Sequence, residues 1–116
     1  MNLDEFDKAN RERCESPAGF DHALDSWSLS DWITACVGEL GEAANIVKKL
    51  NRVRDGIPGN KETEAELKAK LARELADTFI YLSLTAQCAG VRLSEIVPEV
   101  FDCKSEEIGY PVQFRK

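Results

Sequence analysis

Two pairs of acidic residues carry the chemistry that this sequence offers. Glu39 and Glu42 form the first pair, and Glu74 and Asp77 form the second. Residues three apart lie side by side on one face of an α-helix, so each pair presents two carboxylates together. If the two helical faces meet, the four acids form an oxygen-rich site for a cation.

Both pairs interrupt rows of residues that are otherwise largely apolar at helical spacing. The row through the first pair contains Trp32, Ala35 and Ile46, and the row through the second contains Leu67, Leu71, Tyr81, Leu84 and Cys88. Such rows face a core or another helix. A single Glu-x-x-Glu is usually a solvent-exposed face, since glutamate is mostly exposed. Carboxylates within apolar rows are costly unless they are paired, hydrogen-bonded or bound to a metal, so two such pairs favour a site.

The ligand set predicts a hard cation. Neither acidic pair is followed by a histidine at helical spacing, and the chain has one histidine, His22, to which we assign no role. The four cysteines are widely separated without a Cys-x-x-Cys, which argues against a zinc site. Carboxylates alone favour Mg²⁺, with Mn²⁺ as a substitute. A Mg²⁺ site of this kind can orient a triphosphate and activate a water for attack on phosphorus.

Composition limits the classes of protein that fit. A chain of 116 residues is long enough for one domain, and 43% hydrophobic with 31% charged residues is typical of a folded protein in water. The net charge of −6 argues against nucleic-acid binding, which needs a basic surface. No apolar run approaches the roughly 20 residues of a membrane span, and the acidic N-terminus does not look like a signal peptide. We therefore expect a cytoplasmic protein.

The elements that must position the acids are helices, so the predicted fold class is all-α. We expect a helical bundle with two long antiparallel core helices plus shorter N- and C-terminal helices, in a single domain over residues 1–116. The expected helices span residues 3–14, from a cap at Ser28 or Ser30 to about 51, from about 64 to 89, and from a cap at Ser94 to about 107. The expected core stripe of the second helix is Ile33, Cys36, Leu40, Ala43, Val47 and Leu50.

Residues that typically start, end or interrupt helices support these boundaries. Thr63 followed by Glu66 has the spacing of a capping box at the start of the third helix. Gly90 is the residue type that usually ends a helix in the left-handed conformation. Pro98 falls near the first turn of the fourth helix, where it can delay the start of that helix. The segment 52–60 between the long helices has the turn residues of a flexible loop.

Four motifs carry a resemblance to a known family. They are WSLSDW at residues 27–32, GELGEA at 38–43, ELADTFIYL at 74–82 and SEEIGYP at 105–111. Together, over about residues 27–114, the chain resembles the MazG-like family of all-α nucleoside triphosphate pyrophosphohydrolases. The resemblance implies that the four acids bind Mg²⁺ and that a (d)NTP is split between its α and β phosphates into (d)NMP and pyrophosphate. It also implies a homodimer or homotetramer in which helices of neighbouring chains close the active site.

The last helix departs from the family pattern at three positions. Members of this type often carry a lysine, an asparagine and an arginine where this chain has Val100, Asp102 and Glu107. An added carboxylate near a triphosphate is repulsive, so no nucleotide-binding role is transferred to Asp102 or Glu107.

Four other residues are candidates for substrate binding. Lys48 and Lys49 follow the first acidic pair and can reach substrate phosphates, although cations near a helix C-terminus are common without such a role. Trp32 and Tyr81 share the rows of the acids and can contact a base, although aromatic residues at this spacing are more often core.

Three functions are compatible with the sequence. The first is a Mg²⁺-dependent nucleoside triphosphate pyrophosphohydrolase, acting on canonical or damaged nucleotides as nucleotide-pool house-cleaning. The second is a non-catalytic metal-binding helical bundle that acts as an interaction protein. The third is a phosphohydrolase that acts on another pyrophosphate-containing substrate. An enzyme of the first kind releases pyrophosphate only with a divalent cation.

Overall fold

The computed structural model describes residues 1–115, and within that range the chain forms only helices, turns and loops. The elements are α1 (Leu3–Glu15), the short 3₁₀-helix η1 (Leu24–Ser26), α2 (Leu29–Arg54), α3 (Glu64–Cys88) and α4 (Leu93–Ile108). The predicted all-α class is confirmed, since four α-helices and no strand occur in the described part of the chain.

The two long helices begin at capping boxes. Ser28 caps α2 together with Asp31, and Thr63 caps α3 together with Glu66. In each box the hydroxyl accepts from the third backbone N–H of the helix while the carboxylate accepts from the N–H of the cap residue. The predicted capping box at Thr63 is therefore confirmed. At the other end of α3, Gly90 follows the helix with φ +72°, a left-handed conformation that suits glycine.

The start of α4 differs from the prediction. The helix begins at Leu93 after Arg92, which makes no side-chain cap, so the expected cap at Ser94 is wrong. Ser94 instead donates from its hydroxyl to Asp4 of α1 at 2.6 Å, and Arg92 pairs with the same carboxylate. Pro98 lies inside the helix without ending it, since a proline removes only the one N–H that would reach back four residues.

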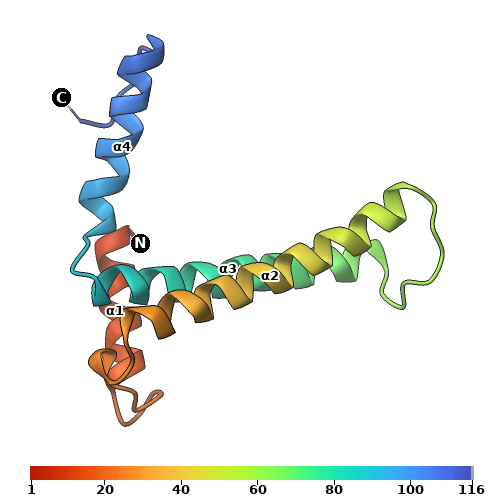
Figure 1. Ribbon diagram of the computed structural model, residues 1–116, viewed down its shortest axis with the longest axis horizontal. Helices are drawn as coiled ribbons and strands as arrows, with labels where there is room; N and C mark the ends of the chain where they lie inside the picture. The colour runs from red at the N-terminus through yellow and green to blue at the C-terminus, as the bar shows by residue number, and fades with distance from the viewer. Residues whose placement is uncertain (116) are drawn as a thin grey trace.

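The helices form two arms. Figure 1 shows α2 and α3 side by side as an antiparallel hairpin, with α1 and α4 following one another along a second arm that meets the hairpin at one end. The radius of gyration is 17.8 Å, against about 13 Å for a compact domain of this length. No helix among residues 1–115 has both the length and the apolar character needed to cross a membrane.

The core lies where the two arms meet. Its buried residues are Cys14, Leu24, Trp32 and Leu84, with Tyr81 and Cys88 packed against them. A buried polar cluster joins α1 to α3, in which the Ser83 hydroxyl donates to Asp7 at 2.6 Å and the Gln87 amide donates to the Asp7 backbone carbonyl. These bonds fix α1 across the C-terminal half of α3.

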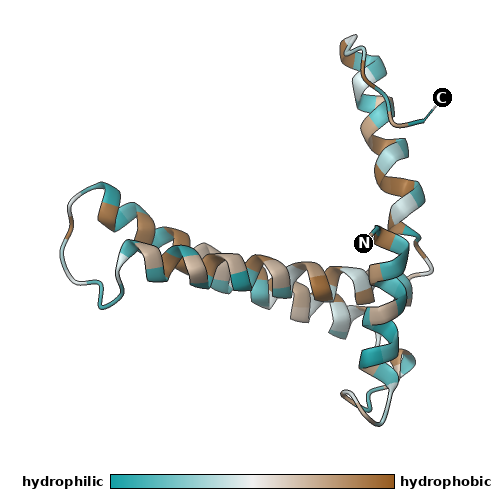
Figure 2. Cartoon of the chain, turned by 180° about the vertical axis from the view of Figure 1, so that it is seen from behind, coloured by the Kyte–Doolittle hydropathy of each residue, from teal (hydrophilic) through white to brown (hydrophobic). Residues whose placement is uncertain are grey.

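The predicted core stripe of α2 is only partly buried in the single chain. Cys36 and Ala43 are buried, as expected. Ile33, Leu40 and Val47 are exposed, so their assignment to the core of this chain is wrong. The face of α2 that meets α3 is rotated toward the row that contains Trp32 and the acids. Figure 2 shows hydrophobic residues along the length of α2, α3 and α4, not only at the junction of the arms.

Candidate metal site and adjoining cavity

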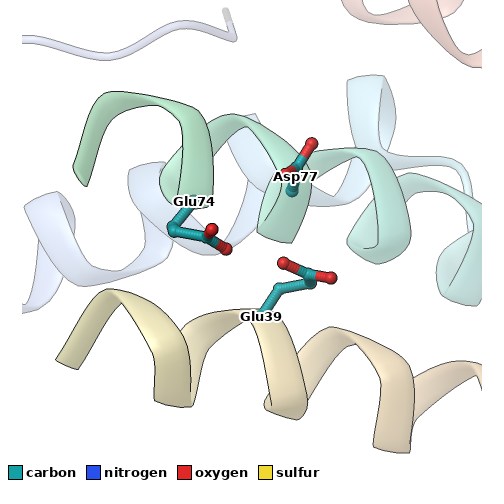
Figure 3. Close-up of side chains that lie close together, drawn as sticks. All are labelled: Glu39, Glu74 and Asp77. Carbon is teal, nitrogen blue, oxygen red and sulfur yellow. The ribbon is translucent and has the colours of Figure 1, made fainter. Parts of the chain in front are cut away.

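Three of the predicted acids meet between α2 and α3. Glu39, Glu74 and Asp77 each place one carboxylate oxygen within 4.8 Å of the others. Figure 3 shows Glu39 rising from α2 toward the side chains of Glu74 and Asp77 on α3. Glu39 and Glu74 are half-buried, whereas Asp77 is exposed. The antiparallel hairpin therefore brings both predicted pairs to one place.

Glu42 completes the acidic cluster from its exposed side. The negative charge of Glu74 is the largest cause that raises the pKa of Glu42 above its ordinary value. The pKa of Glu74 is raised as well, first by hydrogen-bonding contact with the Glu39 carboxylate and then by burial. Carboxylates this close repel one another when all are ionised, so the cluster is unfavourable without protons or a cation.

One oxygen of the cluster has no donor. Glu74 Oε2 is buried and accepts no hydrogen bond from residues 1–115. A buried acceptor without a partner is costly. A divalent cation satisfies such an oxygen and neutralises its neighbours, and a ligand set made only of carboxylate oxygens suits Mg²⁺ or Mn²⁺. The residues present therefore fit the cation that the sequence predicts.

A cavity of about 350 Å³ adjoins the acids, and Asp77 lines both. The other walls come from α1, the loop after it, the start of α2 and the C-terminal half of α3. Its lining is mostly apolar and includes the rings of Phe20, His22, Trp27, Trp32 and Tyr81. A flat apolar ligand with a charged end can thus enter the aromatic cavity and reach the acids.

A tight loop builds the outer wall of this cavity. The backbone N–H of Phe20 donates to Arg13 at 3.0 Å, and that of His22 donates to Cys14 at 2.8 Å, so residues 16–22 fold back on the end of α1. Gly19 allows this approach, because a Cβ there would lie 2.0 Å from the backbone oxygen of Arg13. Asp21 takes up a positive φ of 50° beside it.

Two tryptophans, one buried and one partly exposed, contact each other in the lining of the cavity. Trp32 is buried, and its indole N–H donates to the Leu24 carbonyl at 2.8 Å. Its ring centroid lies 4.7 Å from that of Trp27, and the edge of His22 meets both rings. Trp32 is therefore a core residue, which is the more common place for an aromatic residue at this spacing. It also presents ring surface to the cavity.

The two predicted lysines lie farther along α2, six and seven residues after Glu42 at about 1.5 Å rise per residue. Lys49 donates to Glu62 at 3.1 Å, and its backbone carbonyl accepts from Asn60. Lys49 thus helps hold the loop 55–63 against α2. Lys48 is exposed near the same end of the hairpin.

The altered residues of the last helix have other partners. Asp102 is buried and accepts from the backbone N–H groups of Phe114 and Arg115, both at 2.7 Å. Glu107 pairs with Lys104 at 2.8 Å. Within one chain α4 packs on α1, not beside the acids. The carboxylate of Asp102 therefore anchors the C-terminal tail, which explains why an acid occupies this position.

Residues of the cavity to which the sequence assigned no binding role include Asn10, Arg13, Phe20, His22 and Trp27. They lie in α1 and in an irregular segment, far in sequence from α3. The one available signal was the concentration of aromatic residues between positions 20 and 32, in a stretch without helical periodicity.

Comparison of the chain with protein-family models, with curated proteins and with solved structures found no match. The geometry of the acids and the cavity is therefore the basis for assigning a function.

Proposed function

We propose that this protein is a Mg²⁺-dependent nucleoside triphosphate pyrophosphohydrolase of the MazG-like type. The observation that carries the proposal is the position of Asp77, which belongs to the group of three carboxylates and also lines the aromatic cavity. A nucleotide has the matching chemistry, because its flat base suits an aromatic cavity and its phosphates need cations. The proposed role is nucleotide-pool house-cleaning in the cytoplasm.

Each acid has a distinct part in this proposal. Glu39, Glu74 and Asp77 hold the cation, with Glu74 Oε2 as one ligand atom. A Mg²⁺ ion held by these residues would neutralise phosphate charge and make a water more acidic. Glu42 lies beside Glu74 at the exposed edge of the cluster, where it orients the attacking water and takes its proton. Water attacks the α phosphorus, the bond to the α–β bridging oxygen breaks, and pyrophosphate leaves.

The remaining predicted contacts are part of the same proposal. Trp32 and Tyr81 present ring surface to the base, together with Trp27 at the mouth of the cavity. Lys48 and Lys49 contribute positive charge toward the distal phosphates. For Lys49 this requires the side chain to leave Glu62, which also pairs with Lys70.

The proposed assembly is a homodimer or homotetramer. A monomer of 13.0 kDa has an accessible surface of about 6,300 Å², whereas this chain exposes 8239 Å². The excess of about 1,900 Å² is more than the roughly 800 Å² per partner of a standard interface. The exposed Ile33, Leu40 and Val47 supply apolar surface for it.

Identification of the products by ³¹P NMR tests the activity. With Mg²⁺ and a panel of canonical and modified (d)NTPs, we expect monophosphate and pyrophosphate, and no reaction in EDTA. Glu42→Gln should abolish turnover with the fold intact by circular dichroism, while Glu12→Gln, an exposed acid of α1, should not. Release of orthophosphate would contradict the proposed bond cleavage. No reaction with any nucleotide would favour a non-catalytic bundle or a different pyrophosphate-containing substrate.

A further inference from the structure

Two residues of opposite charge line the cavity. Asp77 belongs to the acidic cluster, and Arg13 is the only lysine or arginine among the lining residues that the structure describes. Both are exposed, whereas Trp32 and Leu84 of the same lining are only 3% and 4% exposed. The two charges therefore lie toward the open side of the cavity, and these apolar side chains lie deeper.

The guanidinium of Arg13 has no acceptor within residues 1–115. It forms no ion pair or hydrogen bond there, whereas the neighbouring arginine of α1, Arg11, pairs with Glu15 at 2.9 Å. It lies instead against the ring of Phe20, whose centroid is 5.5 Å from the Arg13 Cζ. An aromatic ring attracts a cation but offers no oxygen to its N–H groups, so these donors remain available to a ligand.

The loop after α1 holds the guanidinium in this position. The backbone N–H of Phe20 donates to the backbone carbonyl of Arg13 at 3.0 Å, so a backbone bond joins the two residues whose side chains are in contact. Phe20 also lines the cavity, and it is 69% exposed. The guanidinium is therefore kept beside the mouth of the cavity instead of extending into solvent.

A triphosphate brings negative charge to a place that is already acidic. Its phosphates would lie beside the cluster formed by the two acidic pairs. The last helix does not supply the cations of the family pattern, because Val100 and Glu107 occupy their positions and α4 packs on α1. On α2, Lys49 is paired with Glu62. Arg13 is an unpaired cation on a wall that the acids share.

We infer that Arg13 binds phosphate oxygens of the substrate at the mouth of the cavity. The inference rests on the proposed function for the identity of the substrate as a nucleotide. A guanidinium is always charged in proteins, and its planar fork of N–H groups matches two phosphate oxygens. With the base among the buried apolar side chains, the phosphates emerge at the open side, where Asp77 and Arg13 lie. The cavity of about 350 Å³ is small for a ligand pocket, so one ligand that fills it touches both walls.

Tryptophan fluorescence separates contact with phosphate from contact with the base. Trp27 and Trp32 line the cavity and report the binding of nucleosides and of uncleavable α,β-methylene (d)NTPs, both measured with Mg²⁺. Arg13→Gln should weaken binding of the triphosphate analogue by about tenfold or more, the loss expected for a hydrogen bond to a charged group. Its effect on nucleoside affinity should stay within about twofold, because no such bond is lost. Lys8→Gln, which removes a positive charge from an exposed position of α1, should change neither.

A second variant and the wild-type protein provide further tests. Arg13→Lys keeps the charge and loses the planar fork, so its affinity for the triphosphate analogue should lie between those of wild type and Arg13→Gln. Circular dichroism checks that each variant is folded. The wild-type comparison holds even if a variant is not, since the triphosphate analogue should bind about tenfold or more tightly than the nucleoside.

Three results would overturn the inference. An equal loss of affinity for nucleoside and triphosphate analogue in Arg13→Gln would place Arg13 against the base. An unchanged affinity for the analogue in that variant would remove Arg13 from the binding surface. A wild-type protein that binds the analogue no more tightly than the nucleoside would show that the mouth holds no phosphate.

Inorganic tripolyphosphate separates this inference from the proposed function. Its binding with Mg²⁺, measured by calorimetry, should be lost in Arg13→Gln and kept in Lys8→Gln. That outcome, in a protein that releases no pyrophosphate from any nucleotide, would leave the phosphate contact of Arg13 standing and contradict the proposed function. Pyrophosphate release by wild type, with unchanged phosphate affinity in Arg13→Gln, would do the reverse.

Discussion

Glu74 lies between two other acids, with Glu39 on one side and Glu42 on the other, and this position makes it the most informative residue of the site. Its buried Oε2 lacks a donor, and the pKa of its carboxyl is raised by Glu39 and by burial. Both features are unfavourable for the folded chain alone and favourable for a chain that binds a cation. Residues that lower the stability of the folded chain at one site are typically residues that serve a function there.

Replacement of Glu74 by glutamine should therefore have opposite effects on stability and on cation binding. In EDTA the melting temperature of Glu74→Gln should rise, because one negative charge leaves the cluster. Mn²⁺ affinity, measured by calorimetry, should fall by at least about tenfold, since even groups that only support a ligand account for 10–100-fold. An unchanged Mn²⁺ affinity would exclude Glu74 as a ligand. Glu12→Gln serves as the matched control.

At this scale the sequence predicted the acids but not the place of Asn10 in the cavity wall, for a physical reason. Spacing along one helix determines that Glu74 and Asp77 share a face, and a local pattern reveals it. The position of Asn10 in the cavity wall depends on its contact with Ile80, which exists only after α1 has docked on α3. Pairs that far apart in sequence leave no periodic signal.

The loop after α1 is the element that turns a helical hairpin into a cavity. It carries Phe20 and His22 into the wall by backbone bonds to the last turn of α1. This arrangement depends on the absence of a side chain at Gly19.

Gly19→Ala should disrupt that wall. A Cβ 2.0 Å from the Arg13 carbonyl oxygen forces the backbone apart, at a cost of about 1–3 kcal/mol in the free energy of unfolding. Urea denaturation measures the cost, and a change in the fluorescence of Trp27 and Trp32 reports the change at the cavity. Ala18→Ser, at the neighbouring exposed position, should change neither. Wild-type stability for Gly19→Ala would show that the loop does not approach α1 so closely.

The C-terminal tail is held by a second, pH-dependent contact. Burial alone would raise the pKa of Asp102, but the N–H groups of Phe114 and Arg115 and the guanidinium of Arg115 lower it overall. A lowered pKa means that the contact contributes its full stability above the ordinary aspartate pKa of about 4. The contact is lost only as the pH falls further, through the lowered pKa of Asp102. The amide NMR signals of Phe114 and Arg115 should follow this titration, and in Asp102→Asn they should shift already at pH 7.

The opposite result would be equally clear. If both amide signals stay unchanged from pH 7 down to about 2, well below the ordinary aspartate pKa, the tail is not held by this carboxylate.

At the scale of elements, the sequence predicted all four helices but not this tail contact. The family pattern marks Asp102 only as a departure, whereas its role depends on where the chain returns after Gly109.

The whole molecule is open, and its accessible surface is larger than is usual for a monomer of its mass. The second apolar face of α2, which contains Ile33, Leu40 and Val47, has no cover within the chain. Periodicity could not distinguish this face from the one that meets α3, because both are apolar at helical spacing. Which of them packs inside the chain depends on the hairpin geometry, and the other is available to a second copy.

Light scattering after size-exclusion chromatography tests the assembly. The wild-type protein should elute with twice or four times the mass of 13.0 kDa. Val37→Glu places a charge on a side chain that is 60% exposed on α2 and should shift the protein toward the monomer. Lys8→Glu on the exposed side of α1 should not. A wild-type protein that is monomeric at micromolar concentration would contradict the proposed assembly.

The rate of pyrophosphate release from (d)NTPs, with Mg²⁺ and with EDTA, tests the central claim most directly. The measurement compares wild type, Glu42→Gln and Glu12→Gln, each shown to be folded. We predict release by wild type and Glu12→Gln only when Mg²⁺ is present, and none by Glu42→Gln. Release that persists in EDTA, or that Glu42→Gln retains, would contradict the assignment of the acidic cluster as the catalytic metal site.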